Sequence, residues 1–161
     1  MRGIHRVITC AHPRERVWKV LTDPALMSLW LMEVEGFEAR VGCEFRFRTK
    51  PAPGFDGVIH CEVLEVEPLR RLVYTWASSR QRERPTIVTW ELESERKGTH
   101  VTLRHEGFTG IGGFFVRSLL GRGWGHKLRD YFPRLLLRMQ ETGDDAARID
   151  RNGLLECPPE R

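Results

Sequence analysis

The stretch WGHKLRDYFPRLLLRMQET, residues 124–142, predicts one long amphipathic helix, and that helix decides the fold. Its apolar residues recur at steps of three and four, the spacing that places side chains on one face of an α-helix. Pro133 removes the backbone hydrogen bond to the carbonyl of Arg129, so we expect a kink there. This apolar face must pack against another part of the fold to be buried. Its residues are Trp124, Leu128, Tyr131 and Phe132, Leu135 and Met139.

The segments before this helix change to a period of two, which is typical of half-buried β-strands. Cys43, Phe45 and Phe47, for example, alternate with charged side chains. The phase of the pattern slips between Val63 and Leu64, which predicts a bulge or a sharp bend in a long strand. Turn-length connections join these segments into an antiparallel meander, with strands expected at 37–41, 43–48, 58–67, 72–76, 88–92 and 101–105.

The N-terminal part of the chain predicts one further strand and two short helices. Residues 4–11 are rich in β-branched side chains, as strands are. Pro13 suits the first position of a helix, and Asp23 followed by proline is a capping signal for a second helix. Between the last strand and the long helix, residues 107–113 contain too many glycines for regular structure, and we expect a lid hinge there. Residues 114–120 form a short amphipathic segment, interrupted by two further glycines.

Length and composition fit one folded domain. Of the 161 residues, 40% are hydrophobic and 30% are charged, which is enough apolar content for a core. No apolar run approaches the roughly 20 residues that cross a bilayer. Residues 1–11 lack the apolar region of a signal peptide, so we expect a cytoplasmic protein. We assign residues 1–142 to one domain and residues 143–161 to a flexible tail.

Charged and metal-binding residue types form no cluster in the sequence. The net charge of +4 comes from arginines spread along the chain, so we do not expect a nucleic-acid partner. The histidines occur singly and the cysteines have no C-x-x-C spacing, so we expect no metal and no cofactor. We interpret Cys10, Cys43 and Cys61 as small buried side chains and Cys157 as an exposed thiol.

This order of elements resembles the helix-grip fold of the START-like superfamily, which includes polyketide cyclases and lipid-transfer domains. Six stretches look like the branch named for activators of the heat-shock-protein-90 ATPase: PRERVWKVLTDPALMSLWL, VGCEFRFR, GVIHCEVLEVEPLRRLVYTW, TIVTWELE, THVTLRHEGF and GRGWGHKL. The resemblance covers roughly residues 4–140. It implies an α+β fold with a curved six- to seven-stranded antiparallel sheet, two short helices and a long C-terminal helix. The chain departs from the pattern at Cys43, at Pro133 and in the tail.

The resembled fold lays the long helix across the concave face of the sheet, and space left between them becomes an apolar pocket. We therefore expect a protein that binds a small hydrophobic or aromatic molecule there. The five tryptophans would form an aromatic wall suited to such a ligand. Judged by residue type alone, the same side chains could simply pack as a core, so both interpretations stay open. The expected ligand-binding residues are Phe45, Phe47, Tyr74, Trp76, Val88, Trp90, Leu103, His105, Trp124, Leu128 and Phe132.

A catalytic alternative depends on His105 and Tyr74. His105 shares a strand face with Val101 and Leu103, so we expect it to point inward. There it would act as acid or base in a polyketide-cyclase or hydrolase type of reaction, with Tyr74 as a hydrogen-bond donor. The competing hypothesis is a core histidine bonded to Tyr74 or to a backbone carbonyl. Between these two, we expect binding rather than catalysis.

Other polar residues also have a functional and a structural interpretation. His60 and Glu62 would form an acid–base pair if a bend turned them inward, and Arg46 and Arg48 would hold an anionic group at the cavity mouth. Strand alternation instead favours solvent-facing positions for all four. A third function class is a chaperone-linked or stress-response adaptor, which predicts an exposed apolar patch on the outer face of the sheet. The tail would also allow a homodimer.

Overall fold

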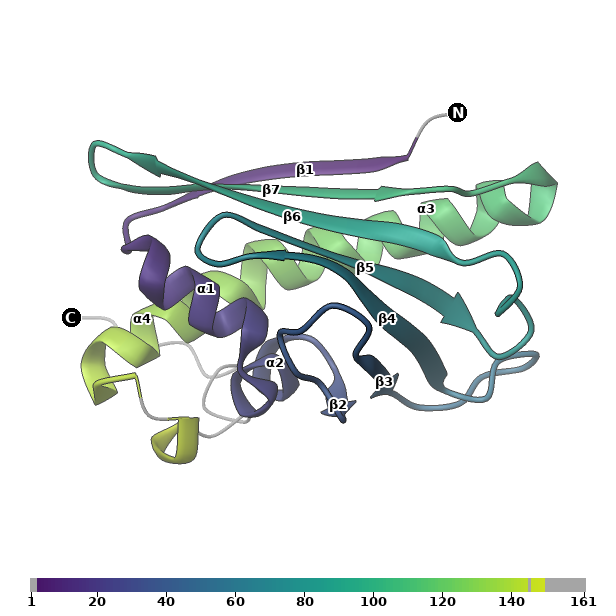
Figure 1. Cartoon of the computed structure of the whole chain (residues 1–161), viewed down its shortest axis with the longest axis horizontal. Coiled ribbons are helices and arrows are strands. Elements are labelled where there is room, and N and C mark those ends of the chain that lie inside the picture. Colours follow the sequence, from purple (N-terminus) through teal and green to yellow (C-terminus); the bar gives the residue numbers. More distant parts are fainter. Residues whose placement is uncertain (1–2, 145, 150–161) are drawn as a thin grey trace.

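An antiparallel sheet with a long helix across one face forms the frame of the molecule (Figure 1). The computed structural model describes residues 3–144 and 146–149. The strands within this part are β1 (Ile4–Cys10), β2 (Glu33–Glu35), β3 (Glu44–Arg48), β4 (Val58–Glu67), β5 (Arg71–Ser78), β6 (Thr86–Glu95) and β7 (Gly98–Glu106). The helices are α1 (Arg14–Thr22), α2 (Pro24–Trp30), α3 (Gly110–His126), the π-helical turn η1 (Lys127–Tyr131), α4 (Phe132–Thr142) and the short 3-10 turn η2 (Ala146–Arg148).

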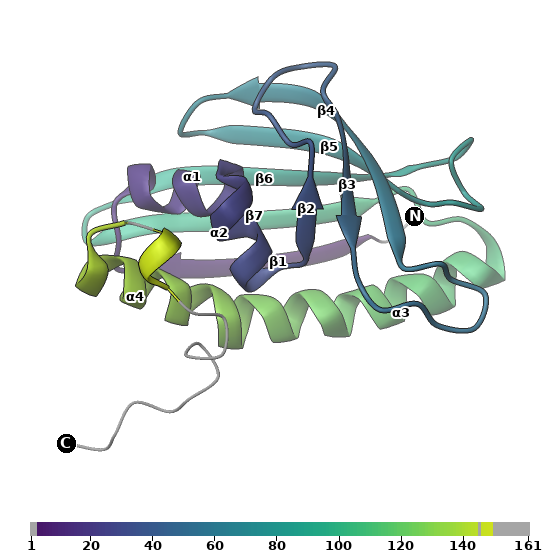
Figure 2. The same ribbon diagram turned by 90° about the horizontal axis from the view of Figure 1, so that it is seen from below.

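The strand order in the sheet is β1-β7-β6-β5-β4-β3-β2. The first strand therefore pairs with the last, and the remaining strands follow one another as the expected meander. Seen from below, α3 and α4 run along the sheet on the side that also carries α1 and α2 (Figure 2). This arrangement confirms the α+β helix-grip fold predicted from the sequence.

The strand predicted at 37–41 is wrong, because this segment is a loop and β2 lies earlier in the chain. Gly36 and Gly42 bracket the loop with φ angles of +77° and +87°, which favour glycine and turn the chain away from an extended path. Phe37 is nevertheless buried, since its ring packs edge-on against Phe45 with centroids 4.9 Å apart. Val41, the last apolar residue of the apparent alternation, is 60% exposed.

Two local predictions are confirmed. The pairing of β4 with β5 shifts in register between Val63 and Glu65, where the apolar phase slips in the sequence. The Asp23 carboxylate accepts hydrogen bonds from the backbone amides of Ala25 and Leu26, at 2.9 and 3.2 Å. This cap satisfies two of the unpaired amides at the start of α2.

The long helix begins earlier than the sequence predicts. Residues 110–142 are helical throughout, so the expected irregular segment at 107–113 and the expected interruption after 120 are both wrong over these residues. Each glycine in a helix costs about 1 kcal/mol relative to alanine. Contacts with the rest of the core offset this cost, since Val116, Leu120 and Trp124 follow at four-residue spacing and pack against it.

Pro133 is accommodated by a π-helical turn. The turn, η1, directly precedes α4, and the amide of Phe132 donates to the carbonyl of Lys127 five residues back. A proline ring clashes with the carbonyl four residues before it and has no N–H to donate. Widening the preceding turn by one residue relieves that clash, so the expected kink takes the form of this turn.

The first residues after α4 pack back onto the short helix α1. Gly143, at a φ of +77°, ends the helix. The guanidinium of Arg16 then pairs with the Asp144 carboxylate at 2.9 Å, and the ammonium of Lys19 donates to the Asp144 carbonyl. Ile149 is buried. The rest of the segment predicted to be a tail, residues 150–161 with Cys157, lies outside the described residues.

Candidate functional site

The interior under the C-terminal half of the long helix is filled by aromatic rings. The ring of Trp30 lies 5.9 Å from Trp90 and 5.0 Å from Phe132, and Trp124 lies 5.6 Å from Trp90, all edge-on. Such edge-to-face contacts stabilise a core beyond the burial of the rings alone. This packed interior contains nine of the eleven residues expected to hold a ligand: Phe45, Phe47, Tyr74, Val88, Trp90, Leu103, His105, Leu128 and Phe132.

His105 is fully buried and connects the long helix to the sheet. The indole N–H of Trp124 donates to its Nδ1 at 3.0 Å, and its Nε2 lies 2.6 Å from the hydroxyl of Thr86. Since Nδ1 accepts, the proton is on Nε2, and the Thr86 hydroxyl in turn donates to the carbonyl of Trp76 at 3.0 Å. Burial lowers the pKa of His105 to about 3. The ring is therefore neutral at pH 7, with both nitrogens bonded, and its partners differ from those expected.

Tyr74 is also enclosed, and its hydroxyl accepts a hydrogen bond from the indole N–H of Trp90 at 3.1 Å. Burial raises the pKa of the Tyr74 hydroxyl, so it stays protonated near neutral pH. Tyr74 and His105 thus belong to separate hydrogen-bonded pairs, and neither lines the pocket described next. A reaction that uses both groups would require the packed rings around them to move.

An open pocket remains where the N-terminal half of α3 crosses the sheet. Its volume is about 440 Å³, within the range of roughly 300–1,000 Å³ that is typical of small-molecule sites. Its walls come from α3, from β4 and β5, from the loop between β5 and β6, and from the loop between β3 and β4, which crosses α3 in the view of Figure 2. Its larger apolar lining residues are Phe55, Ile59, Trp76, Phe108, Val116, Leu119 and Leu120.

A second pocket, of about 180 Å³, adjoins the first and lies further along α3. The two share Phe55, Ile59, Trp76 and Leu120, so we treat them as one site and call it the α3 groove. Trp76 and Trp124 are the two of the eleven expected residues that line it. The residues found only in the smaller pocket are Leu31, Met32, Thr49, Gly123, Trp124 and Lys127.

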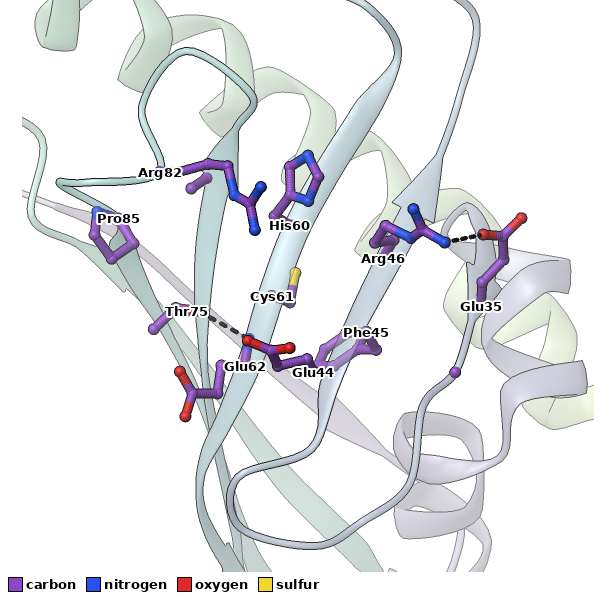
Figure 3. Close-up of a pocket in the computed structure, with 12 residues that line it drawn as sticks. Glu35, Glu44, Phe45, Arg46, His60, Cys61, Glu62, Thr75, Arg82 and Pro85 are labelled. Atoms are coloured by element: carbon purple, nitrogen blue, oxygen red, sulfur yellow. Dashed lines mark hydrogen bonds and ion pairs between the residues drawn. The ribbon is translucent and has the colours of Figure 1, made fainter.

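A polar pocket of about 510 Å³ lies on the opposite, outer face of the sheet (Figure 3). His60 lies there with its Nε2 3.0 Å from the Ser79 hydroxyl. Burial lowers the pKa of His60, and the positive charge of Arg82 lowers it further. Glu62 is exposed on the same face. His60 and Glu62 thus point away from the interior, as strand alternation predicts.

Several arginines on this outer face are paired with carboxylates. Glu35 binds Arg46 at 3.4 Å and Arg48 at 2.7 Å, so neither guanidinium is directed at the α3 groove. Further along the face, Glu91 pairs with both Arg71 and Arg104. The adaptor hypothesis predicts an apolar patch on this face, whereas these ion pairs make the part of the face that they occupy charged.

A further hollow, of about 560 Å³, lies between the edge strand β1 and the long helix. Leu128 lines it together with Cys10, whose thiol pKa is raised by burial to about 11. Two arginines line it: Arg6 donates to the carbonyls of His5 and Gly121, and Arg129 pairs with Asp130. Both guanidinium groups therefore already have partners within the protein.

The described residues contain neither a metal cluster nor a membrane helix. Within 3–144 and 146–149, no three His, Cys, Asp or Glu side chains group as metal ligands would. None of the helices in those ranges is both long enough and apolar enough to cross a bilayer.

Sequence reasoning missed most of the residues that line the α3 groove. Phe55 is a large apolar side chain in the otherwise loop-like stretch PAPGFDG. A large apolar residue in such a loop indicates that the loop packs against another part of the fold. Val116 and Leu120 belong to a segment recognised as amphipathic, but its glycines hid its continuity with the long helix. Arg80 and Arg84 look like any solvated arginines, because only the fold brings their loop to the groove.

Comparison with known proteins places the chain among proteins of the same fold. Residues 11–128 match the model of the family described as Activator of Hsp90 ATPase homolog 1-like protein. No curated protein matches the sequence. Among solved structures, protein MLL2253 from Mesorhizobium loti is similar with a TM-score of 0.74 and 31% identity, over 85% of this chain and 98% of that one.

Two more distant structures share the fold. The Aha1 dimer from Colwellia psychrerythraea has a TM-score of 0.66 and 20% identity, over 80% of this chain and 91% of that one. CalU16 from Micromonospora echinospora has a TM-score of 0.66 and 24% identity, over 88% of this chain and 74% of that one.

Proposed function

The chain belongs to the Activator of Hsp90 ATPase homolog 1-like protein family, and from that premise we propose that it binds a small apolar or aromatic molecule in the α3 groove. The supporting observation is the pocket of about 440 Å³ between α3 and the sheet, which side chains of the chain itself leave open. Its walls are mainly apolar, and such walls supply most of the binding free energy for a small ligand.

We propose that the protein binds this molecule and does not catalyse a reaction on it. General acid–base catalysis requires a group within hydrogen-bond reach of the substrate. His105 has both ring nitrogens bonded and a pKa far below neutral, and Tyr74 is held by Trp90. These placements support a ligand carrier or sensor over a cyclase or hydrolase that would use this pair.

The neutral dye N-phenyl-1-naphthylamine, which fluoresces when it leaves water, tests the proposal. Saturable binding is expected for the wild type. Leu120→Trp should weaken it at least tenfold, because Leu120 lines both pockets and a larger ring would fill the space between them. Leu137→Trp is the matched control: it makes the same change at a half-exposed position on α4 that does not line the groove.

Three results would count against a binding role for the groove. They are the absence of saturable dye binding, an unchanged affinity in Leu120→Trp, and an equal loss in Leu137→Trp. Circular dichroism of each variant checks that the fold is retained. Native mass spectrometry of the wild type, as purified from cells, would then identify a molecule that is already bound.

A second candidate function is association with another protein molecule, and one observation favours it. The N-terminal half of α3 exposes a row of large apolar side chains: Ile111 at 80%, Phe114 at 57%, Phe115 at 67% and Leu119 at 71%. Exposed apolar clusters commonly mark interaction surfaces, and the related Aha1 of Colwellia psychrerythraea is a dimer.

Sedimentation velocity of the wild type and of the double variant Phe114→Ser/Phe115→Ser separates this candidate from a purely monomeric carrier. Association through α3 predicts a concentration-dependent dimer in the wild type and a monomer in the variant. A wild type that stays monomeric at 100 μM and above, roughly the range of weak protein contacts, excludes self-association by this surface.

A further inference from the structure

We propose that the ligand of the α3 groove is an amphipathic molecule with an anionic group, which binds Arg80 and Arg84 while its apolar body lies against Trp76 and Ile59. The inference rests on the proposed function and adds the chemical class of the ligand. That class is a carboxylate, sulfonate or phosphate carried on an apolar or aromatic body.

The charge of the groove lining is entirely positive. The larger pocket is lined by Arg80 and Arg84, and the smaller one by Lys127, while no Asp or Glu lines either pocket. The whole chain contains 22 acidic residues among 161. An apolar hollow whose charged lining residues are all cationic attracts anionic ligands and disfavours cationic ones.

Arg80 and Arg84 differ from the paired arginines of the outer face in having no partner of their own. Among the described residues, neither guanidinium forms an ion pair or a side-chain hydrogen bond, whereas Arg46 and Arg48 both pair with Glu35. Their donors are therefore available, and a guanidinium binds carboxylate, sulfonate and phosphate oxygens through two parallel hydrogen bonds.

The acidic residue beside Arg80 is already engaged elsewhere. Asp56 and Arg80 line a neighbouring hollow. The carboxylate of Asp56 accepts from the Ser79 hydroxyl at 2.5 Å and from the Val58 amide at 3.1 Å. These hydrogen bonds lower the pKa of Asp56 and fix its orientation, so its oxygens are held by their own loop and strand.

Alternate arginines of the loop between β5 and β6 lie on opposite sides of the sheet. Its turns are closed by hydrogen bonds from the Gln81 amide to the Ser78 carbonyl and from the Arg84 amide to the Gln81 carbonyl. Arg80 and Arg84 line the α3 groove, while Arg82 between them lines the outer pocket, close to His60 in Figure 3. Arg82 is thus a built-in control of equal charge in the same loop.

The arginines and most of the apolar lining lie in different parts of the groove. Arg80 and Arg84 line only the larger pocket, Phe55 and Ile59 line both pockets, and Trp124 and Lys127 line only the smaller one. A ligand with its anionic group at the arginines would place its body in the part of the groove where burial from water is most favourable.

Two dyes that share one aromatic scaffold test the inference. 1-Anilinonaphthalene-8-sulfonate carries a sulfonate, and N-phenyl-1-naphthylamine is the same framework without it. The wild type should bind the sulfonate more tightly. Arg80→Gln/Arg84→Gln should weaken sulfonate binding about three- to tenfold and change neutral-dye binding less than twofold, since two exposed charge pairs contribute modestly. Arg82→Gln should change neither.

Two controls make the readout specific to the groove. Sulfonate fluorescence that persists in Leu120→Trp reports dye bound elsewhere, for example on the exposed face of α3, and is subtracted. Raising NaCl from 50 to 500 mM should weaken sulfonate binding and leave neutral-dye binding unchanged, because salt screens exposed charges.

The outcomes distinguish recognition of an anionic group from binding in the groove itself. An equal loss for both dyes in Arg80→Gln/Arg84→Gln, or no loss for either, overturns the anionic-ligand inference while groove binding stands. An equal effect of Arg82→Gln on the sulfonate also overturns it, since only net charge would then matter. If the wild type binds neither dye in the groove, the proposed function itself fails.

Discussion

Lowering the pH from 7 to 5 should destabilise the folded protein by about 2 kcal/mol through His105 alone. Its pKa is about 3 in the folded state and ~6.5 in an unfolded chain. Between these values the unfolded chain binds a proton that the folded state does not. The contribution is therefore fully present above pH 6.5 and is lost as the pH falls toward 3. Each pH unit inside that window costs about 1.4 kcal/mol, so the loss reaches about 5 kcal/mol below pH 3.

Urea unfolding followed by tryptophan fluorescence, at pH 7 and pH 5, measures this loss. The reference is His105→Gln, which does not titrate and keeps an amide for hydrogen bonding. His12 and His60 also have lowered pKa values, but they are present in both proteins and cancel in the comparison. Asp56 and Asp130 have lowered pKa values, so the stability that they contribute is lost below pH 5.

Equal losses in the wild type and in His105→Gln between pH 7 and pH 5 would refute the reasoning. If the variant does not fold, the wild type alone still decides the matter. An NMR titration of His105 should then show a neutral ring, protonated on Nε2, throughout pH 5–7. A midpoint near 6.5 would mean that the ring is not held in the Trp124–His105–Thr86 chain.

Three further substitutions test the elements that hold the fold and the groove in place. Asp23→Ala should lower the stability by about 1 kcal/mol in thermal unfolding, because α2 loses its cap, whereas Asp23→Asn should lose less. Trp124→Phe leaves Nδ1 of His105 without a donor and should cost about 1–3 kcal/mol in urea, beyond the loss of ring area. Gly57→Ala should lower the stability by more than ~1 kcal/mol and so lower the thermal unfolding midpoint. Gly57 has a φ of +82°, and an added Cβ would lie 2.4 Å from the Thr49 carbonyl oxygen. An unchanged thermal midpoint would contradict this prediction.

The sequence predicts those parts of the fold that depend on local periodicity. The alternation in β3 and the phase slip in β4 are each set by neighbouring residues, so the strand and its bulge at Val63 could be predicted. The capping signal of Asp23 before Pro24 likewise depends only on neighbouring residues. The strand expected at 37–41 fails because Phe37 is buried by a contact with Phe45, not by membership of a sheet, and alternation cannot distinguish these causes.

The α3 groove was harder to predict because each of its walls is built by long-range contacts. Glycines at 110–113 argue against a helix from propensity alone, yet α3 forms there because Phe108, Val116 and Leu120 pack on the core. Phe55 lines the groove because the fold brings its loop to the same pocket as that helix. Most of the aromatic residues predicted to surround a ligand are buried in the packed interior, and periodicity alone does not distinguish a core position from the wall of a pocket.

The two halves of the long helix therefore have different roles. The half that begins at Trp124 contributes Phe132, Leu135 and Met139, all buried, and contains η1 as its irregular turn. The other half is rich in glycine, exposes Phe115 and its apolar neighbours, and borders the hollow. Large-to-small substitutions at buried positions of the C-terminal half should each lower the stability by about 2–5 kcal/mol. Substitutions at exposed positions of the N-terminal half should change it by no more than about 0.5 kcal/mol. Substitutions at exposed positions near the groove can therefore be made with little loss of stability, whereas Trp124 both lines the groove and donates to His105, so its substitution affects the groove and the stability together.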